Sequence, residues 1–225
     1  MPSQSFKEFQ KNLTDVKRLI SLHNTLSRPN GSGTRGKRGL GHLTRGGIVL
    51  LCAAWERYVE SVLEEGAAFL ATKHTLATLP AAPKKLVQDF VNGGKSTITA
   101  AALPTNLKTA MVEAVRFKTV GSPSANAFGL NNPKYQKIKP LFEKAVDVAD
   151  IATAWSGGTT LIDDFVSARG EVAHRGGQAK YVHFAVLTKA VVLVSDYVTE
   201  TDNYLSDHLR TLVSPNHRPW NRQAT

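Results

Sequence analysis

A long helical stripe in the first third of the chain constrains the fold more than any other feature. Apolar residues recur there at three- and four-residue spacing, which is typical of one buried helical face. The apolar residues are Ile48, Leu51, Cys52, Trp55, Val59, Val62, Leu63 and Phe69. Glutamates fall between them, at Glu56, Glu60, Glu64 and Glu65. The pattern predicts a helix from about His42 or Gly47 to Ala71, with the glutamates outside its apolar face.

Helical spacing continues through most of the chain, whereas alternating strand patterns are scarce. Other helices are predicted over residues 5–26, 80–90, 104–117, 133–146, 160–175 and 180–212. Capping boxes at Ser5-x-x-Glu8 and Thr160-x-x-Asp163 mark two of the starts, and Gly176-Gly177 is expected to close the 160–175 helix. The predicted fold is an all-α helical bundle with a small helical insertion near residues 76–125.

Composition shifts divide the chain into four predicted segments. Residues 1–27 form an N-terminal amphipathic helix, and residues 28–46 form a basic, glycine-rich linker, since the stretch from Arg28 to Gly47 contains seven glycines. Residues 47–212 form the main helical domain, and residues 213–225 form a flexible basic tail.

The charge distribution favours a polyanionic partner. The formal net charge is +10, and residues 1–46 hold nine lysines and arginines against two acids. Residues 145–209 reverse this balance, with four basic and nine acidic residues. The basic part of one copy can therefore meet the acidic part of another, or a basic entry can lie beside a neutral body. Basicity for solubility alone is the alternative reading.

Several protein classes are excluded by what the sequence lacks. Its longest apolar run, from Ile48 to Ala54, is seven residues, far below the ~18 needed to span a bilayer. The polar N-terminus does not resemble a signal peptide, so we expect a cytoplasmic protein and no membrane partner. Cys52 is the single cysteine, which excludes a disulfide or a multi-cysteine metal site. The usual motifs for serine nucleophiles, zinc and nucleotide phosphates are missing, and no metal or cofactor is expected.

The segment with the clearest chemical content is residues 161–176, LIDDFVSARGEVAHRG, which contains Arg169 and His174. The spacing Arg-x4-6-His is loose, and it also occurs at Arg18/His23, Arg35/His42 and Arg210/His217. Context distinguishes Arg169, because a Trp-Glu helix precedes it, the sequence FGLNNP lies at 128–133, and a long final helix follows. In this order, over about residues 44–210, the chain resembles the RiboL-PSP-type branch of the HEPN superfamily.

The resemblance implies a metal-independent endoribonuclease that works as a homodimer with its site at the dimer interface, often in a bacterial toxin, antiphage or stress system. RNA would be cut by its own 2′-OH, leaving 2′,3′-cyclic phosphate and 5′-OH ends. An antitoxin or other regulatory partner would restrain such an enzyme.

The residue types fit this chemistry. Histidine's ordinary pKa of ~6.5 suits proton transfer at neutral pH, so His174 would move the proton. The fixed fork of Arg169 suits the scissile phosphate. We also expect Arg175 and Arg45 to contact RNA, and Glu56 and Gly170 to support the site. Gly170 stands where the family often has a polar residue such as Asn.

Geometry adds a constraint, since five helical residues at ~100° each separate Arg169 and His174 by roughly 140° around the axis. Either the helix distorts near Gly170 or ends before His174, or two copies together complete the site.

Two other functions remain open from the sequence. One is a catalytically silent HEPN bundle that binds RNA or protein, which Gly170 favours. The other is a helical scaffold with no nucleic-acid role. In these readings Arg169 pairs with Asp163, Asp164 or Glu171, and His174 is a helix C-terminal residue favoured by the helix dipole.

Overall fold

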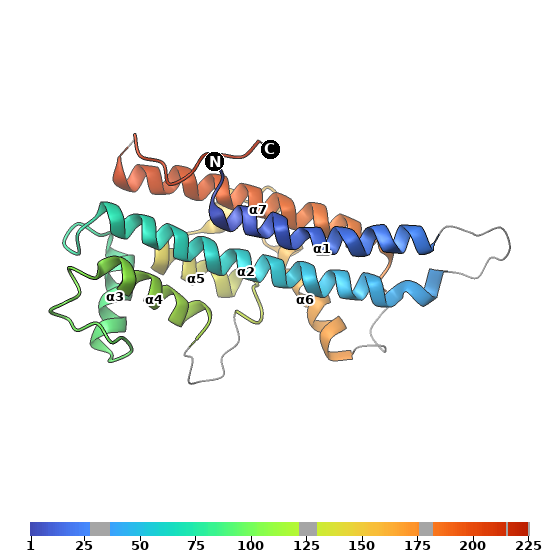
Figure 1. The fold of residues 1–225 in the computed structure, drawn as a ribbon, viewed down its shortest axis with the longest axis horizontal. Helices are drawn as coiled ribbons and strands as arrows, with labels where there is room; N and C mark the ends of the chain where they lie inside the picture. The colour runs from blue at the N-terminus through green and yellow to red at the C-terminus, as the bar shows by residue number, and fades with distance from the viewer. Residues whose placement is uncertain (28–36, 122–129, 176–181, 215, 225) are drawn as a thin grey trace.

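The protein is an all-helical bundle in a computed structural model that describes residues 1–27, 37–121, 130–175, 182–214 and 216–224 (Figure 1). The helices are α1 (Gln4–Leu26), α2 (Gly41–Lys73), α3 (Ala81–Asn92), α4 (Leu107–Thr119), α5 (Tyr135–Val146), α6 (Thr160–Arg175) and α7 (Phe184–Val213). Short 3-10 turns occupy Lys37–Leu40 and Ile151–Ala154. The predicted fold class is confirmed. Among the details, α5 continues through Pro140, and α4 begins at Leu107 rather than at Pro104.

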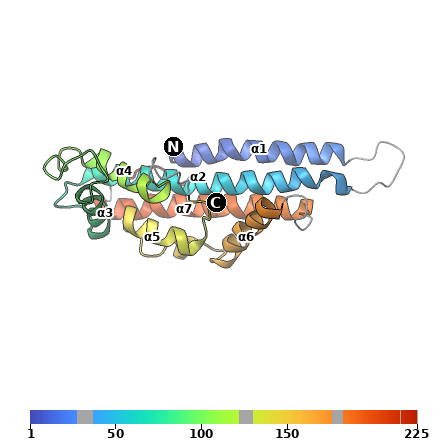
Figure 2. The ribbon, with the colours of Figure 1, turned by 90° about the horizontal axis from the view of Figure 1, so that it is seen from below.

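Three long helices, α1, α2 and α7, run along the length of the molecule (Figure 1). Figure 2 shows α1 on one side of α2 and α7, and α5 and α6 on the other. The shorter helices α3 and α4 lie toward one end, where α4 packs against α2 and α3 packs against α4 and α5 (Figure 1). The long central helix expected from the apolar stripe is therefore covered on several sides.

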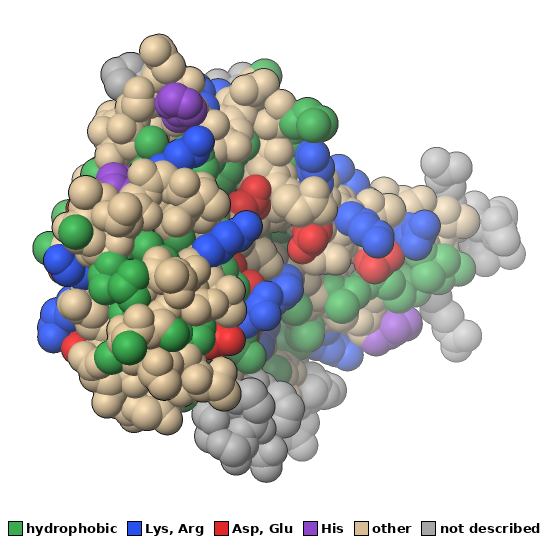
Figure 3. All heavy atoms as spheres, turned by 60° about the vertical axis from the view of Figure 1, so that its left-hand side comes forward, with side chains coloured by type: hydrophobic (Ala, Val, Ile, Leu, Met, Phe, Trp, Pro, Cys, Tyr) green, Lys and Arg blue, Asp and Glu red, His purple; other side chains and the backbone are tan. Residues whose placement is uncertain are grey.

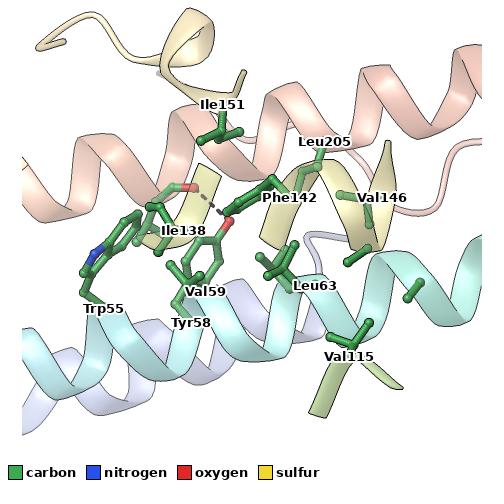
Figure 4. Packing of buried hydrophobic residues seen from close by; sticks show 14 of the residues in the cluster. Trp55, Tyr58, Val59, Leu63, Val115, Ile138, Phe142, Val146, Ile151 and Leu205 are labelled. Atoms are coloured by element: carbon green, nitrogen blue, oxygen red, sulfur yellow. Dashed lines mark hydrogen bonds between the residues drawn. The ribbon is translucent and has the colours of Figure 1, made fainter. Parts of the chain in front are cut away.

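The hydrophobic core is built around α2. Trp55, Tyr58, Val59 and Leu63 are all at most 1% exposed, and Figure 4 shows them facing Phe142 and other apolar side chains of α5 and α7. Burying one such side chain stabilises the fold by roughly 1.5–3 kcal/mol.

A buried hydroxyl also joins two of the long helices. The hydroxyl of Tyr58 donates to the carbonyl of Val198 at 3.2 Å, so the polar tip of this ring is satisfied inside the core (Figure 4).

Helix α1 belongs to the same core. Phe9, Leu13 and Val16 are at most 2% exposed and lie in the same cluster as the α2 side chains. The division of the chain into separate segments stays a prediction, but residues 4–26 pack as a full member of the bundle.

The glutamates of α2 depart from the expectation that they lie outside the packed face. Glu60 is 5% exposed. Glu65 accepts from the backbone N–H of Ser5 at 3.0 Å and from its hydroxyl at 2.8 Å, which ties the start of α1 to α2. Glu64 pairs with Arg116 of α4 at 2.8 Å. These carboxylates are connectors between helices, because each receives donors from another part of the chain.

Both predicted capping boxes are wrong. The N-cap of α1 is Ser3, whose side chain accepts from the N–H of Phe6 at 2.9 Å, while Ser5 lies inside the helix. In α6, Thr160 is the first helical residue rather than the cap, and Oδ1 of Asp163 accepts from the N–H of Tyr135 at 2.7 Å. In each case the expected capping side chain serves a tertiary contact instead.

The turn before α6 is fixed on α7. The hydroxyl of Tyr197 donates to the carbonyl of Gly158 at 2.7 Å. A Cβ at Gly157 would come within 2.6 Å of that hydroxyl oxygen, so this position needs glycine. Trp155 completes the contact, because its Nε1 donates to the Thr201 hydroxyl at 2.9 Å.

The linker and the tail also differ from expectation. Residues 41–46 of the predicted linker form the first turns of α2, whereas residues 28–36 and Gly176-Gly177 lie outside the described residues. The tail was expected to be flexible, yet Trp220 is 5% exposed and its Nε1 donates to the carbonyl of Asp202 at 3.0 Å. The N–H of Asn221 donates to the carbonyl of Met1 at 2.9 Å, so the two ends of the chain meet on α7.

Candidate functional site

Arg169 lies in α6 and connects that helix to α2. Its side chain is 25% exposed, and its Nη2 lies 3.8 Å from Oε2 of Glu56 on α2. Its Nη1 donates to the carbonyl oxygen of Asn131 at 3.1 Å. The predicted partners within α6 were Asp163, Asp164 or Glu171, but the ion pair that the structure describes is with Glu56.

Glu56 also holds the backbone that Arg169 contacts. Its Oε1 accepts from the N–H of Asn131 at 2.8 Å. The preceding N–H, of Leu130, donates to Oε1 of Glu60 at 3.2 Å. Asn131 has a φ of 49°, in the left-handed region that Asn tolerates better than most residues. Two glutamates one turn apart on α2 therefore bind consecutive N–H groups of residues 130 and 131.

The other end of this segment is held as well. The indole N–H of Trp55 donates to the carbonyl of Pro133 at 3.2 Å. Two residues further on, the N–H of Tyr135 is bound by Asp163 of α6. Residues 130–135 are thus held between α2 and α6, and Arg169 of α6 contacts both this segment and Glu56 of α2.

The surroundings of Arg169 are only partly hydrated. Burial raises the pKa of Glu60, and the N–H of Leu130 and the guanidinium of Arg57, at 3.4 Å, oppose that rise. Cys52 is fully buried, and burial raises the pKa of its thiol to about 12, although the charge of Arg169 acts in the opposite direction. The thiol stays protonated at neutral pH and cannot serve as a nucleophile.

His174 lies in the last turn of α6 and is exposed. The helix is unbroken from Thr160 to Arg175, so it neither ends before His174 nor loses helical structure at Gly170. The separation of roughly 140° between Arg169 and His174 therefore stands. Arg169 contacts α2, His174 is exposed to solvent, and no hydrogen bond between their side chains occurs in the described part of the chain.

The remaining predicted site residues lie in different settings. Gly170 is in the interior of α6, and a Cβ there would meet nothing within 4 Å. Arg45 is half-buried near the start of α2, and within the described ranges no hydrogen bond or ion pair joins it to Arg169 or His174. Arg175 ends α6, but its side chain lies outside the described residues, as does its predicted phosphate contact.

Across the described residues, no group of three or more His, Cys, Asp or Glu side chains is placed to hold a metal ion. None of the helices in those residues combines the length and apolarity needed to cross a bilayer.

Sequence reasoning missed two participants, Asn131 and Glu60. Asn131 acts through its backbone N–H and carbonyl, which no side-chain motif records. Glu60 lies off the apolar stripe of α2, and the signal in the sequence is its position one turn after Glu56, which puts both carboxylates on the same side of the helix. The sequence FGLNNP at 128–133 contains the contacting residues, but nothing in it identifies α2 as their partner.

The fold and the site together define a class: an all-helical bundle in which a central helix carrying Trp55 and Glu56 holds the arginine of an Arg-x4-His helix. The RiboL-PSP-HEPN family model matches residues 8–207, and the chain belongs to this family. HEPN domains typically include ribonucleases, and they often bind RNA and dimerise. No curated protein and no solved structure gives a significant match to the chain.

Proposed function

We propose that the protein is a metal-independent endoribonuclease in which Arg169 binds the scissile phosphate and His174 transfers the proton. The observation that carries the proposal is the fixed position of Arg169, whose guanidinium is held between Glu56 and the carbonyl of Asn131. An arginine placed in this way needs little reorganisation as charge builds on a phosphate. Its guanidinium has five N–H donors, so donors remain for phosphate oxygens beside the two described contacts.

The chemistry is attack by the 2′-OH on the adjacent phosphorus. His174 takes the proton of the 2′-OH and delivers it to the leaving 5′-oxygen, so the same imidazole acts first as base and then as acid. Arg169 stabilises the charge on the non-bridging oxygens. The P–O5′ bond breaks, and the products are a 2′,3′-cyclic phosphate and a 5′-OH.

A second copy of the chain completes the site in this proposal. The continuous α6 directs Arg169 and His174 to different sides, so one chain alone does not supply both groups to one phosphate. Exposed apolar side chains on α6 and on the neighbouring α7 support self-association: Leu161 on α6 is 48% exposed, and Val186 and Val192 on α7 are 48% and 60% exposed. Arg45 and Arg175 are proposed as further RNA contacts.

The family resemblance suggests the biological setting. We place the activity in a bacterial toxin, antiphage or stress system in the cytoplasm, with an antitoxin or other regulatory partner to restrain it.

The alternative function is a silent HEPN bundle that binds RNA without cutting it. Gly170 favours it, since the hydrogen bond that a polar side chain would offer there is absent. The space around Gly170 is open, so the Gly170→Asn variant fits without a clash. A gain of cleavage in Gly170→Asn, starting from an inactive protein, would support the silent reading.

The test is incubation of the purified protein with labelled mixed-sequence RNA in EDTA, followed by analysis of fragment length and 3′-end chemistry. Cyclic-phosphate ends are expected from the wild type and not from Arg169→Ala or His174→Ala. The chain offers matched controls in Arg210→Ala and His217→Ala, which alter another pair with Arg-x4-6-His spacing. Cleavage by both Arg169→Ala and His174→Ala at the wild-type rate would overturn the residue assignment.

The dimer is tested separately by mixing the two inactive variants. If each site takes Arg169 from one chain and His174 from the other, a mixed dimer of Arg169→Ala and His174→Ala regains one intact site and part of the activity. Failure of any mixture to regain activity, with mixed dimers shown to form, would place both groups in one chain.

A further inference from the structure

A cavity of about 830 Å³ lies at the end of the molecule where α4 packs against α2, and it is also lined by the end of α3 and the residues that follow it. Its volume falls within the range of small-ligand sites, roughly 300–1,000 Å³. Figure 3 brings this end forward and shows acidic and basic side chains together around a hollow in the face. The cavity does not include Arg169 or His174.

The acidic side chains in the cavity are already bound by donors from the cavity itself. Glu64 accepts from Nε and Nη2 of Arg116, at 2.9 and 2.8 Å. Glu113 accepts from the hydroxyl of Ser96 at 3.1 Å. Their charges are therefore partly compensated before any ligand enters.

Two cations in the cavity are held more weakly. Lys95 is exposed, its Nζ lies 4.7 Å above the ring centre of Phe117, and it has no ion pair among the described residues. The side chain of Arg57 is 53% exposed, and its contact with Glu60 is 3.4 Å long. Such cations exchange their partners readily for a bound anion.

An aromatic surface lies directly under one of these cations. The rings of Phe117 and Phe90 pack with their centres 5.6 Å apart, and Phe117 is only partly buried. A flat ring stacks on such a face, and any nucleobase suits it, because every base has a π surface. Lys95 is long enough to move from the ring to the edge of a bound base and meet a phosphate there.

We propose that this cavity binds a nucleotide, with the base on Phe117 and the phosphate between Lys95 and Arg57. The polar groups of Ser96 and Glu113 supply hydrogen bonds for the ribose and the base edge, which an aliphatic anion would leave unused. The nucleotide is a free mononucleotide or the terminal nucleotide of an RNA strand, since both offer the same base and phosphate. The site is independent of the ribonuclease residues.

Binding is measured by isothermal titration calorimetry in EDTA. The probes are AMP, UMP, adenosine, inorganic phosphate and a 5′-phosphorylated 2′-O-methyl RNA tetranucleotide, which lacks the 2′-OH nucleophile and cannot be cut. The test variants are Lys95→Ala and Phe117→Leu. Lys108→Ala is the matched lysine control, because Lys108 is exposed on α4 outside the cavity.

Phe69→Leu is the matched aromatic control. Phe69 lies 6.0 Å under Nζ of Lys73, and so has the same kind of cation contact outside the cavity. Circular dichroism and the melting temperature of each variant show that it is folded.

We expect AMP, UMP or the tetranucleotide to bind more tightly than adenosine or phosphate. Phe117→Leu should weaken binding by roughly 5- to 100-fold, the range for losing one base stack, and Lys95→Ala should weaken it by about tenfold, while the controls retain wild-type affinity. Binding of AMP or UMP identifies a free nucleotide, and binding of the tetranucleotide alone identifies a strand end. The proposal is overturned if no nucleotide probe binds, if phosphate binds as tightly as AMP, or if the folded cavity variants keep wild-type affinity. None of these results depends on RNA cleavage.

Discussion

Asp202 makes the stability of this protein depend on pH in a direction opposite to that of most carboxylates. It lies on α7 and is fully buried, and its Oδ1 accepts a hydrogen bond from the hydroxyl of Ser3. Oδ2 of the same carboxyl is buried as well. Burial raises the pKa of this carboxyl from 3.8 to about 7, and the nearby charge of Glu65 raises it further, against the hydrogen bond from Ser3.

The sign of the effect follows from proton binding. Between about pH 4 and pH 7 the folded protein keeps a proton on Asp202 that the unfolded chain has lost. The stabilising contribution is therefore complete below about pH 4 and is lost as the pH rises through 7. A rise from 3.8 to about 7 corresponds to ~4 kcal/mol at 1.36 kcal/mol for each pKa unit.

The variant Asp202→Asn mimics the protonated acid at every pH. At pH 8 its free energy of unfolding should exceed that of the wild type by about 2–4 kcal/mol, and near pH 4 the two should agree within about 1 kcal/mol. Urea unfolding followed by circular dichroism from pH 4 to 8.5 measures both. Asp207→Asn is the control, since this carboxylate on the same helix is 33% exposed and pairs with Arg218. Parallel pH profiles for the wild type and Asp202→Asn would refute the reasoning.

Three further predictions follow from single contacts. Glu56→Gln keeps an oxygen that can accept from the N–H of Asn131, but it removes the negative charge 3.8 Å from Arg169. The free energy of unfolding should therefore fall by about 1–2 kcal/mol, and the rate of RNA cleavage should fall by about tenfold. Unchanged values of both would contradict this prediction. Gly170→Ala should raise the free energy of unfolding by about 1 kcal/mol, because alanine favours a helix more than glycine does and its Cβ would meet nothing within 4 Å. The melting temperature should rise by about 2–4 °C. A lower melting temperature would contradict the position of Gly170 inside α6. Trp220→Ala should lower the free energy of unfolding by about 3–5 kcal/mol, because the buried indole is lost. Limited proteolysis should then cut the C-terminal tail faster than in the wild type. Equal protection of the tail in both proteins would show that the indole does not hold it.

Elements with strong periodicity could be predicted from the sequence. The apolar stripe around Trp55 predicts α2, and the spacing of Leu187, Val194 and Val198 predicts α7. The prediction needs no knowledge of the packing partner, because an apolar helical face is buried against some other part of the protein in any case. The family could also be predicted, because the order of the Trp-Glu helix, the FGLNNP segment and the Arg-x4-His helix can be read from the sequence alone.

The polar contacts could not be predicted in the same way. A glutamate off the apolar stripe fits a solvated position and a tertiary hydrogen bond equally well, and only the fold brings Leu130 to Glu60. The same holds for the tail, whose composition is that of a flexible segment, although Trp220 is buried against α7. Ser5 and Asp163 match capping patterns, yet the Ser5 hydroxyl donates to Glu65 of α2 and the Asp163 carboxylate accepts from the N–H of Tyr135. Local rules fail here because a distant partner competes for the same side chain.

The contacts of Arg169 distinguish it from Arg18, another arginine that matches the Arg-x4-6-His spacing. Arg18 pairs with Asp15 on its own helix, where both side chains are more than 60% exposed, and its histidine, His23, is buried. Such a surface pair fixes a side chain weakly. Arg169 contacts a carboxylate and a carbonyl that belong to two other parts of the chain, and both are held in place by further hydrogen bonds. What favours Arg169 as a phosphate ligand is therefore the support that Glu56 and Asn131 give it. The Arg-x4-6-His spacing alone does not single it out, so we expect a substitution of Glu56 to impair the site although Glu56 is not part of that motif.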